Sequence, residues 1–200
     1  VLEQVYDRPD PLVHAWVLDI RNETDLVSSS PTLTLTFFDD AGNILGEEIA
    51  GALLDSMLPG ELTPFIVEFY GEDPDTLGWS TIGVMVQGTW PYDEYATSDG
   101  LVISETAEKS EERAWSISGK VTNDTATPQS NVRVVAIVRD HGGDFLGSTW
   151  DAVMAPIDPG KWAKFTCDAG FKTIVPYDPF KFGHSASDFA VQLVASRPVV

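Results

Sequence analysis

The feature that most restricts how this chain can fold is a stretch that its sequence contains twice. Residues 39–46 read DDAGNILG and residues 140–147 read DHGGDFLG, so the pattern Gly-x-x-Leu-Gly recurs 101 positions later (140 − 39 = 101). A repeat of this period indicates two copies of one structural unit, each long enough to be a domain. We therefore expect one domain over residues 1–90, a second over residues 101–200, and a junction over residues 91–100.

The match continues on both sides of this stretch. Upstream, DIRNET contains Asn22 where KVTNDT contains Asn123 (123 − 22 = 101). Downstream, LPGELTPFIVEF contains Phe65 where DPGKWAKFTCDA contains Phe165 (165 − 65 = 100). The repeat spans nearly all of each half, and we expect Phe65 and Phe165 to occupy equivalent buried sites.

Within each copy, the hydrophobic residues follow the two-residue period of β-strands. Residues 32–38 read TLTLTFF, which alternates apolar and hydroxyl side chains as a strand with one buried face does. Clusters of Gly, Pro, Asn and Asp separate such runs, and no amphipathic helix is indicated; residues 104–113 read as a strand end and a polar loop. The predicted strands cover residues 2–6, 13–21, 32–38, 43–50, 62–69, 80–87, 101–106, 114–122, 131–139, 144–151, 161–169 and 188–196.

These strands predict an all-β chain made of two tandem immunoglobulin-like antiparallel β-sandwiches. The duplicated stretch is then a hairpin between the third and fourth strands of each copy. We expect Gly42 and Gly143 at the hairpin tips, where the backbone φ is positive and a Cβ atom would be strained.

The residues around the first hairpin resemble the bacterial FxLYD-type domains and related immunoglobulin-like modules. In LTFFDDAGNILG, Phe37, Phe38 and Asp39 stand where these domains have aromatic residues followed by Asp. The second copy keeps Asp140 but has Arg139 in place of the aromatic residue. The resemblance implies a recurrent spacer or binding module of exported and cell-envelope proteins, and it implies no catalytic activity.

The chain is strongly acidic, with 31 Asp and Glu against 12 Lys and Arg and a formal net charge of −19. This charge repels nucleic-acid phosphates and anionic membrane surfaces, so we expect neither as a partner. No apolar stretch approaches the ~18 to 20 residues of a membrane helix. The acidity and the start of the sequence at Val1 lead us to expect an extracellular or cell-envelope protein, anchored in one version as a lipoprotein through a removed leader.

Acidic and amide side chains gather at the tips of both predicted hairpins. The first tip contains Asp39, Asp40 and Asn43, and the second contains Asp140 and Asp144. Oxygen atoms of this kind are the ligands that Ca²⁺ prefers, so calcium is the candidate cofactor. The alternative is that these residues only favour tight turns by hydrogen-bonding to their own backbone.

Large aromatic residues stand between the two copies, where a free linker would rarely have them. Residues 88–100 contain Trp90, Tyr92 and Tyr95. We expect these side chains to pack at the junction and to line the most ligand-like cavity, because clefts form preferentially between domains.

A fourth aromatic candidate lies on a predicted strand of the second copy. Alternation along residues 161–169 places Phe165 and Cys167 in the core, which leaves Trp162 and Lys164 on the outer face. An exposed Trp can stack on a sugar or on a partner protein. The alternative is that a neighbouring segment covers it, while Cys167 is predicted to be a small buried hydrophobic residue.

The sequence lacks a recognisable catalytic motif. His14, His141 and His184 are predicted on a strand, a hairpin tip and a loop, and no two have metal-ligand spacing. We therefore expect a non-catalytic binding or spacer module for a protein or glycan partner. A carbohydrate-binding accessory module is one alternative, which exposed aromatic residues on one face would favour. A hydrolase is the other, and it requires two converging carboxylates.

The net charge generates a first prediction, that the thermal midpoint of unfolding rises with added NaCl. Salt screens the mutual repulsion of the acidic side chains, over a Debye length that falls from ~10 Å at 0.1 M to ~3 Å at 1 M. Calorimetry in a NaCl series measures this rise, and MgCl₂ and CaCl₂ at matched ionic strength separate screening from specific binding. A larger rise with CaCl₂ indicates calcium sites, whereas one constant midpoint in every salt contradicts the role given to repulsion.

Overall fold

The structure is a computed structural model, and it describes residues 3–7, 13–54, 56–70, 74–89, 100–111, 114–143, 145–168 and 189–196. The chain divides into two compact units, unit 1 over Val1–Glu94 and unit 2 over Tyr95–Val200, and this division falls inside the expected junction. In the described ranges the only helical element is the 3₁₀ turn η1 (Pro74–Leu77), and no helix there is long and apolar enough to cross a membrane. The fold is all-β, as predicted.

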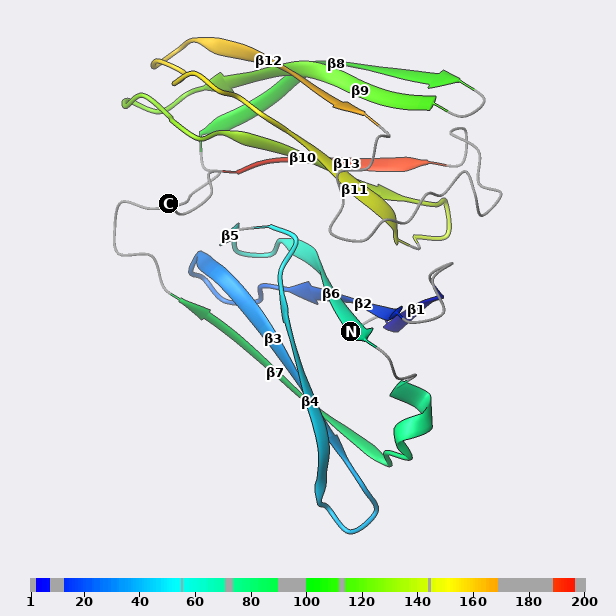
Figure 1. Ribbon diagram of the computed structural model, residues 1–200. Coiled ribbons are helices and arrows are strands. Elements are labelled where there is room, and N and C mark those ends of the chain that lie inside the picture. Colours follow the sequence, from blue (N-terminus) through cyan, green and yellow to red (C-terminus); the bar gives the residue numbers. More distant parts are fainter. Residues whose placement is uncertain are drawn as a thin grey trace. The chain divides into compact units, whose positions relative to one another are not determined.

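Unit 1 consists of two antiparallel sheets (Figure 1). Its strands are β1 (Glu3–Asp7), β2 (Val13–Arg21), β3 (Ser28–Phe38), β4 (Ile44–Gly51), β5 (Ser56–Met57), β6 (Leu62–Tyr70) and β7 (Thr81–Thr89). In one sheet, β2 lies between β1 and β6. In the other, β3 pairs with β4 and β7, and the short β5 pairs with the first two residues of β3.

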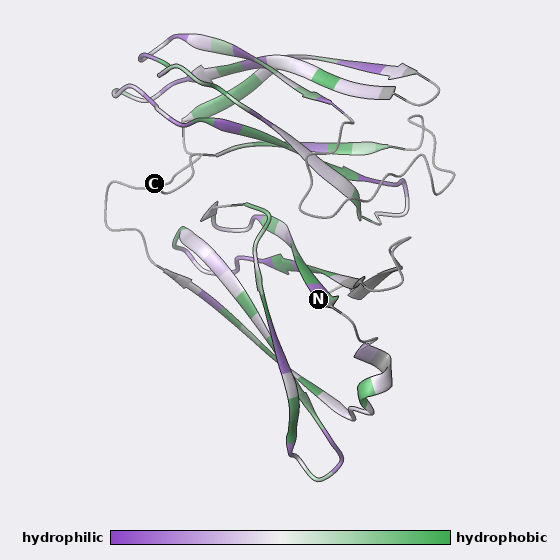
Figure 2. Cartoon of the chain, in the orientation of Figure 1, coloured by the Kyte–Doolittle hydropathy of each residue, from purple (hydrophilic) through white to green (hydrophobic). Residues whose placement is uncertain are grey.

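The core of unit 1 forms where the inner faces of these sheets meet. On β3, Leu33, Leu35 and Phe37 are at most 1% exposed, while the threonines between them are more exposed. Figure 2 shows hydrophobic and hydrophilic residues alternating along the strands. Trp16 and Phe69, from the other sheet, each meet Phe37 at a ring-centroid distance of 5.8 Å in edge-to-face geometry. Such aromatic pairs contribute about 0.5 to 1.5 kcal/mol beyond the area that they bury.

Unit 2 repeats this arrangement of strands. They are β8 (Leu101–Glu111), β9 (Ala114–Asn123), β10 (Arg133–Arg139), β11 (Phe145–Ala152), β12 (Trp162–Asp168) and β13 (Ala190–Ser196). One sheet has the order β12-β9-β8 and the other β11-β10-β13. Phe65 and Phe165 are 0% and 1% exposed, and they pair with the equivalent residues Leu18 and Gly119 (119 − 18 = 101). The prediction of two equivalent buried Phe sites is confirmed.

The two central strands β3 and β10 differ in what surrounds them. Each residue of β10 from Val134 to Val138 is at most 2% exposed, so both faces of this strand are buried. A strand buried on both faces has a continuous apolar sequence, as VVAIV does, whereas the TLTLTFF of β3 alternates. The copies therefore share their strand pairing and differ in their environment.

Every strand predicted from the sequence is present, with most ends shifted by one or two residues. Two ends differ more: β3 begins at Ser28 rather than residue 32, and β8 continues to Glu111 where we expected a polar loop. β8 continues because β9 offers partners along its whole length, with Lys109 opposite Ser116. Its second half is polar on both faces, so hydrophobic periodicity does not reveal it. The short β5 and η1 were missed for the same reason.

The duplicated stretch is a hairpin in both units, as predicted. Gly42 has a φ of 81° and Gly143 a φ of 95°, a region that favours glycine. Each glycine amide donates a hydrogen bond to the carbonyl oxygen of the Asp three residues earlier, at 3.0 and 3.1 Å. In both hairpins the Leu of Gly-x-x-Leu-Gly, Leu45 or Leu146, is the extra residue of a β-bulge. The repeated letters thus encode one turn and one bulge.

A fully buried asparagine joins three segments of unit 2. The side-chain amide of Asn123 donates to the carbonyl oxygens of Thr127 and Ile157, at 2.8 Å each. Its Oδ1 accepts hydrogen bonds from the backbone N–H and the hydroxyl of Thr125. Because both amide hydrogens and the oxygen are used, Asn123 fixes the turn after β9 against the loop that leads to β12. We call this set of bonds the Asn clamp.

Unit 1 contains the same clamp at Asn22, which is 8% exposed. Its amide donates to the carbonyl oxygens of Leu26 and Met57, and its Oδ1 accepts from the N–H and hydroxyl of Thr24. Both asparagines stand in Asn-x-Thr sequences, the pattern of a glycosylation acceptor. Since each Nδ2 is engaged in two hydrogen bonds, these asparagines are structural residues.

The Asn clamp generates a second prediction, that Asn123→Ala lowers the free energy of unfolding by about 2 to 4 kcal/mol. The substitution removes the donor from two backbone carbonyls, and an unsatisfied buried polar group costs about 1 to 3 kcal/mol. Urea denaturation followed by circular dichroism measures the change. Asp124→Ala, at the exposed neighbouring position, is the control and is expected to change it by less than about 0.5 kcal/mol. Equal effects of the two substitutions would remove the clamp from this account.

Candidate binding face

The outer face of the sheet β12-β9-β8 presents an exposed Trp to solvent. Trp162 is 50% exposed, while Cys167 on the same strand is fully buried. The strand register places Trp162 beside Thr122 of β9, which pairs in turn with Val102 of β8. Paired residues of antiparallel strands point to the same side, so all three lie on the outer face. The outward orientation predicted for Trp162 is confirmed.

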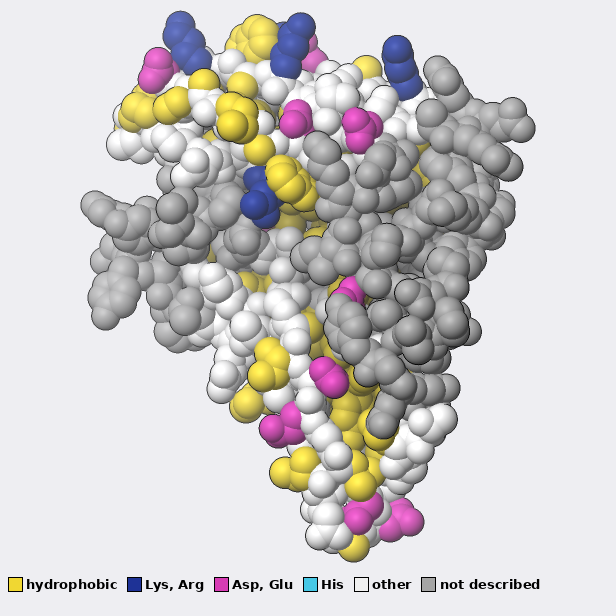
Figure 3. Space-filling view, in the orientation of Figure 1, with side chains coloured by type: hydrophobic (Ala, Val, Ile, Leu, Met, Phe, Trp, Pro, Cys, Tyr) yellow, Lys and Arg dark blue, Asp and Glu magenta, His cyan; other side chains and the backbone are white. Residues whose placement is uncertain are grey.

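Two lysines share this face with Trp162. The ammonium of Lys120 lies over the indole ring, 4.5 Å from its centroid, and it also forms an ion pair with Glu105. Lys164 is exposed and lies opposite Lys120 in the register. An exposed cation–π contact contributes about 0.5 to 1 kcal/mol, which restrains the ring. We call Trp162, Lys120, Lys164 and Glu105 the Trp162 face; Figure 3 shows hydrophobic, basic and acidic side chains interspersed over unit 2.

An irregularity in β8 brings Glu105 to Lys120. The pairing of β8 with β9 shifts between Ser104 and Ala107, and Glu105 within this bulge has a φ of 50°. A non-glycine residue in this conformation costs about 1 to 3 kcal/mol unless its surroundings compensate. Sequence analysis did not find this pair, because no residue pattern signals the bulge. Alternation along residues 114–122 alone would have placed Lys120 on the outer face.

The acidic hairpin tip of unit 1 is organised by Asp39. Its carboxylate accepts hydrogen bonds from the backbone N–H groups of Ala41 and Asn43 and from the side-chain amide of Asn43, at 2.8 to 2.9 Å. These bonds, chiefly the one from the Asn43 side chain, hold the pKa of Asp39 below its ordinary value. Asp39 thus performs the turn role that sequence analysis gave as the alternative to calcium, with Asp40 exposed beside it.

The second acidic tip has only one of its candidate ligands in the described part of the chain. Asp140 begins the equivalent turn, and Asp144 lies outside the described residues. Among the described residues, no three His, Cys, Asp or Glu side chains are placed to hold a metal ion. The calcium hypothesis stays a prediction.

The other aromatic candidates are not placed by the structure. Trp90, Tyr92 and Tyr95 lie outside the described residues, and so does most of the segment expected to line a junction cavity. Of the histidines, His141 is exposed at the tip of the second hairpin and His184 lies outside the described residues. The Trp162 face is therefore the predicted site whose geometry can be examined.

The opposite side of the same strand is sealed in the core. The Cys167 thiol donates a hydrogen bond to the carbonyl oxygen of Val134, at 3.4 Å. Burial raises the pKa of Cys167 to about 12, with a smaller contribution from the charge of Asp151. A thiol with this pKa is almost wholly protonated at neutral pH, so the predicted role of Cys167 as a buried hydrophobic residue is confirmed.

Comparisons with known proteins give distant likenesses only. No family model matches the sequence, and no curated protein matches it. A β-glucuronidase of glycoside hydrolase family 2 aligns at 13% identity and a TM-score of 0.29, over 82% of this chain and 20% of that one. A Bacteroides uniformis β-glucuronidase aligns at 15% identity and a TM-score of 0.25, over 78% and 21%. A putative β-galactosidase from Bacteroides fragilis aligns at 13% and 0.23, over 91% and 32%.

The chain spans about a fifth to a third of the length of these structures. A likeness at such TM-scores indicates neither a shared fold nor a shared activity. The functional argument therefore depends on the residues of this chain.

The burial of Cys167 generates a third prediction, that native protein at pH 8 does not react with Ellman's reagent on the timescale of a free cysteine. The raised pKa keeps the thiolate fraction near ~10⁻⁴, and the core excludes the reagent. Absorbance at 412 nm measures the released thiol, and one thiol per chain is expected in urea. Fast reaction of the native protein would show that β12 opens readily or that Cys167 is exposed.

Proposed function

We propose that this chain is a non-catalytic binding module whose Trp162 face contacts a glycan. The observation that carries the proposal is the position of Trp162, half-exposed on the outer face of an antiparallel sheet, with Lys120 over its ring and Lys164 beside it. A restrained, exposed indole in the middle of a polar face is a stacking platform for an apolar sugar surface.

The chemistry of the face suits a sugar that carries hydroxyl or carboxylate groups. The indole supplies a flat apolar surface, and Thr122 supplies a hydroxyl at the neighbouring register position. Lys120 is partly neutralised by Glu105, whereas the exposed Lys164 adds positive charge within a strongly acidic chain. Lys donors at the edge of the platform favour acidic over neutral saccharides through charge-assisted hydrogen bonds.

We propose further that both units are immunoglobulin-like sandwiches related to the FxLYD-type domains. The sheets β1-β2-β6 and β4-β3-β7 support this assignment, since they match the order A-B-E and C′-C-F of that fold. In unit 2 the sheets β8-β9-β12 and β11-β10-β13 have the same order.

Such modules are recurrent parts of exported proteins, and we propose an extracellular or cell-envelope location in agreement with the acidic composition. A binding module also needs no converging acid and base, so we propose that the chain is not an enzyme. The acidic hairpin tips remain the proposed positions for calcium, should it bind.

The fourth prediction tests the Trp162 face. On a glycan array, the native protein is expected to bind acidic glycans, and Trp162→Ala is expected to weaken binding at least tenfold because the stacking surface is lost. Lys164→Ala is expected to weaken binding to acidic glycans more than to their neutral analogues. Titration calorimetry with a glycan from the array gives the affinities.

Met154→Ala is the matched control, because Met154 is 93% exposed and lies in the loop after β11, away from β12 and β9. It removes an exposed apolar side chain without changing the Trp162 face, and binding is expected to be unchanged. Equal binding by the native protein and Trp162→Ala, or no glycan bound at all, contradicts the proposal.

A further inference from the structure

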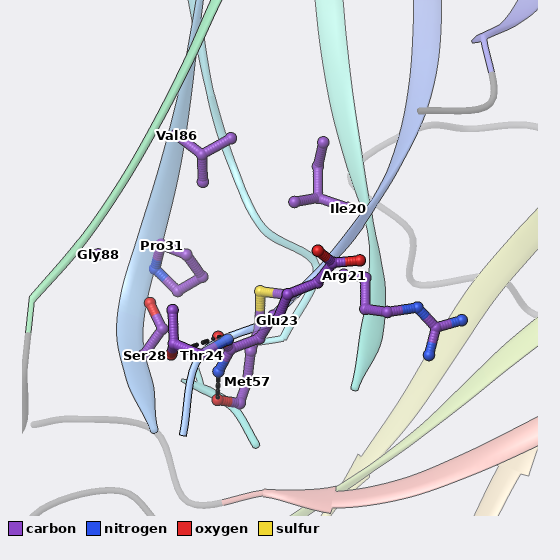
Figure 4. Close-up of a pocket in the computed structure, with 10 residues that line it drawn as sticks. Ile20, Arg21, Glu23, Thr24, Ser28, Pro31, Met57, Val86 and Gly88 are labelled. Carbon is purple, nitrogen blue, oxygen red and sulfur yellow. Dashed lines mark hydrogen bonds between the residues drawn. The ribbon is translucent and has the colours of Figure 1, made fainter. Parts of the chain in front are cut away.

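Unit 1 contains an open groove between β2 and β7. Two adjoining cavities of about 380 and 470 Å³ form it, and Ile20 and Val86 line both. Figure 4 shows these two side chains projecting into the gap from opposite sides, with Pro31 and Met57 further along the first cavity. Val84 extends the apolar lining into the second cavity. We call this the unit 1 groove.

The groove exposes side chains that face the core. The register pairs Val84 with Leu35 and Val86 with Leu33, so the valines lie on the same inner face as the leucines. The leucines are at most 1% exposed, yet Val84 and Val86 are 48% and 42% exposed. Full burial of a Val side chain contributes roughly 1.5 kcal/mol or more. The groove is therefore a part of the sandwich that lacks cover.

In unit 2 the equivalent place is closed. Val121 is the counterpart of Ile20, and Ala195 pairs with β10 as Val86 pairs with β3. Val121 is 0% exposed and Ala195 is 4% exposed, whereas Ile20 is only partly buried and Val86 is 42% exposed. The difference between the units is thus one of cover.

The first half of β8 supplies the cover in unit 2. Residues 101–104, with the sequence LVIS, pair with the end of β9, and β8 also contacts β13. Leu101 and Ile103 point inward, and Leu101 is 9% exposed, while Val102 and Ser104 are exposed. An extended strand with apolar residues at alternate positions is therefore what fills this place.

Unit 1 has a described counterpart for the second half of β8 only. β1 pairs with β2 from His14 to Leu18, and the register ends there. Among the described residues, no strand continues along β2 at Ile20 and Arg21 on the side away from β6. The edge of β2 and the apolar groove beside it lie together.

We propose that the unit 1 groove binds an extended strand of a partner polypeptide, which adds to the edge of β2 and inserts alternate apolar side chains between Ile20, Val84 and Val86. Strand addition gives affinity through main-chain hydrogen bonds, and pockets for alternate side chains give specificity. The groove lies in unit 1 and the Trp162 face in unit 2, so this inference is independent of the proposed glycan binding.

Charge determines the kind of partner. Residues 1–94 contain 18 Asp and Glu and only two basic residues, Arg8 and Arg21, so unit 1 has a net charge of −16 of the total −19. Two copies of unit 1 repel each other, which disfavours a second copy as the occupant. A strand with basic flanking residues is attracted to the same field. The partner is thus a polypeptide that offers a Leu-x-Ile strand between basic residues.

The probe for this proposal, our fifth prediction, is the capped peptide KKLVISKK, and KKSVSSKK is the control peptide of equal charge. Titration calorimetry at 0.15 M NaCl is expected to detect binding of the first peptide, with at least tenfold weaker binding of the second. Hydrogen exchange followed by NMR is expected to show increased protection of the Ile20 and Arg21 amides when KKLVISKK is bound.

The matched variants are Val86→Lys and Met85→Lys, which add the same charge at neighbouring positions of β7. Val86 faces the groove, whereas Met85, 49% exposed, is on the opposite face. Val86→Lys is expected to weaken binding at least tenfold, and Met85→Lys less than threefold. Equal affinity for the two peptides, equal effects of the two variants, or a native dimer that Val86→Lys dissociates in sedimentation would each overturn the proposal. If Val86→Lys does not fold, the amide protection and the peptide pair decide the question.

Discussion

Two buried side-chain amides hold the turns on which both units depend. Asn22 and Asn123 each bind two carbonyl oxygens and two groups of a nearby Thr, and their own carbonyls accept from Gly60 and Gly160, at 2.7 Å in both units. A buried amide that loses any of these partners carries a desolvation cost, so the loops around it are held in one geometry. The loop after β2 or β9 and the turn before β6 or β12 are thereby fixed together, and with them the edges at which both candidate binding surfaces lie.

On this shared framework the two units present different surfaces. In unit 2, residues 101–104 complete the sheet and the outer face carries Trp162 with its lysines. In unit 1 the equivalent slot is open, and almost all of the negative charge of the chain is in this half. On the side seen in Figure 3, the end of unit 1 that holds the β3–β4 hairpin carries acidic and hydrophobic side chains. The duplication preserves what stabilises the fold, and the surfaces that could bind partners have diverged.

Sequence reasoning predicted the features that arise from local patterns. Alternation in TLTLTFF and FTCD gave the strands and the outward position of Trp162, and the repeated Gly-x-x-Leu-Gly gave both hairpins. The features that depend on distant partners were not predictable. Val84 and Val86 have the sequence of a buried strand, and only the missing cover exposes them. Likewise the Lys120–Glu105 pair depends on a bulge, and the polar end of β8 on the strand beside it.

The central claim is that equivalent Asn clamps hold the two units. Hydrogen exchange of the side-chain amides, followed by NMR, tests it most directly, with the exposed Gln87 amide as the reference. The account predicts that the Nδ2 hydrogens of Asn22 and Asn123 exchange at least a hundredfold more slowly than those of Gln87, and as slowly as the Gly60 and Gly160 backbone amides beside them. Exchange of either asparagine at the rate of Gln87 would contradict it.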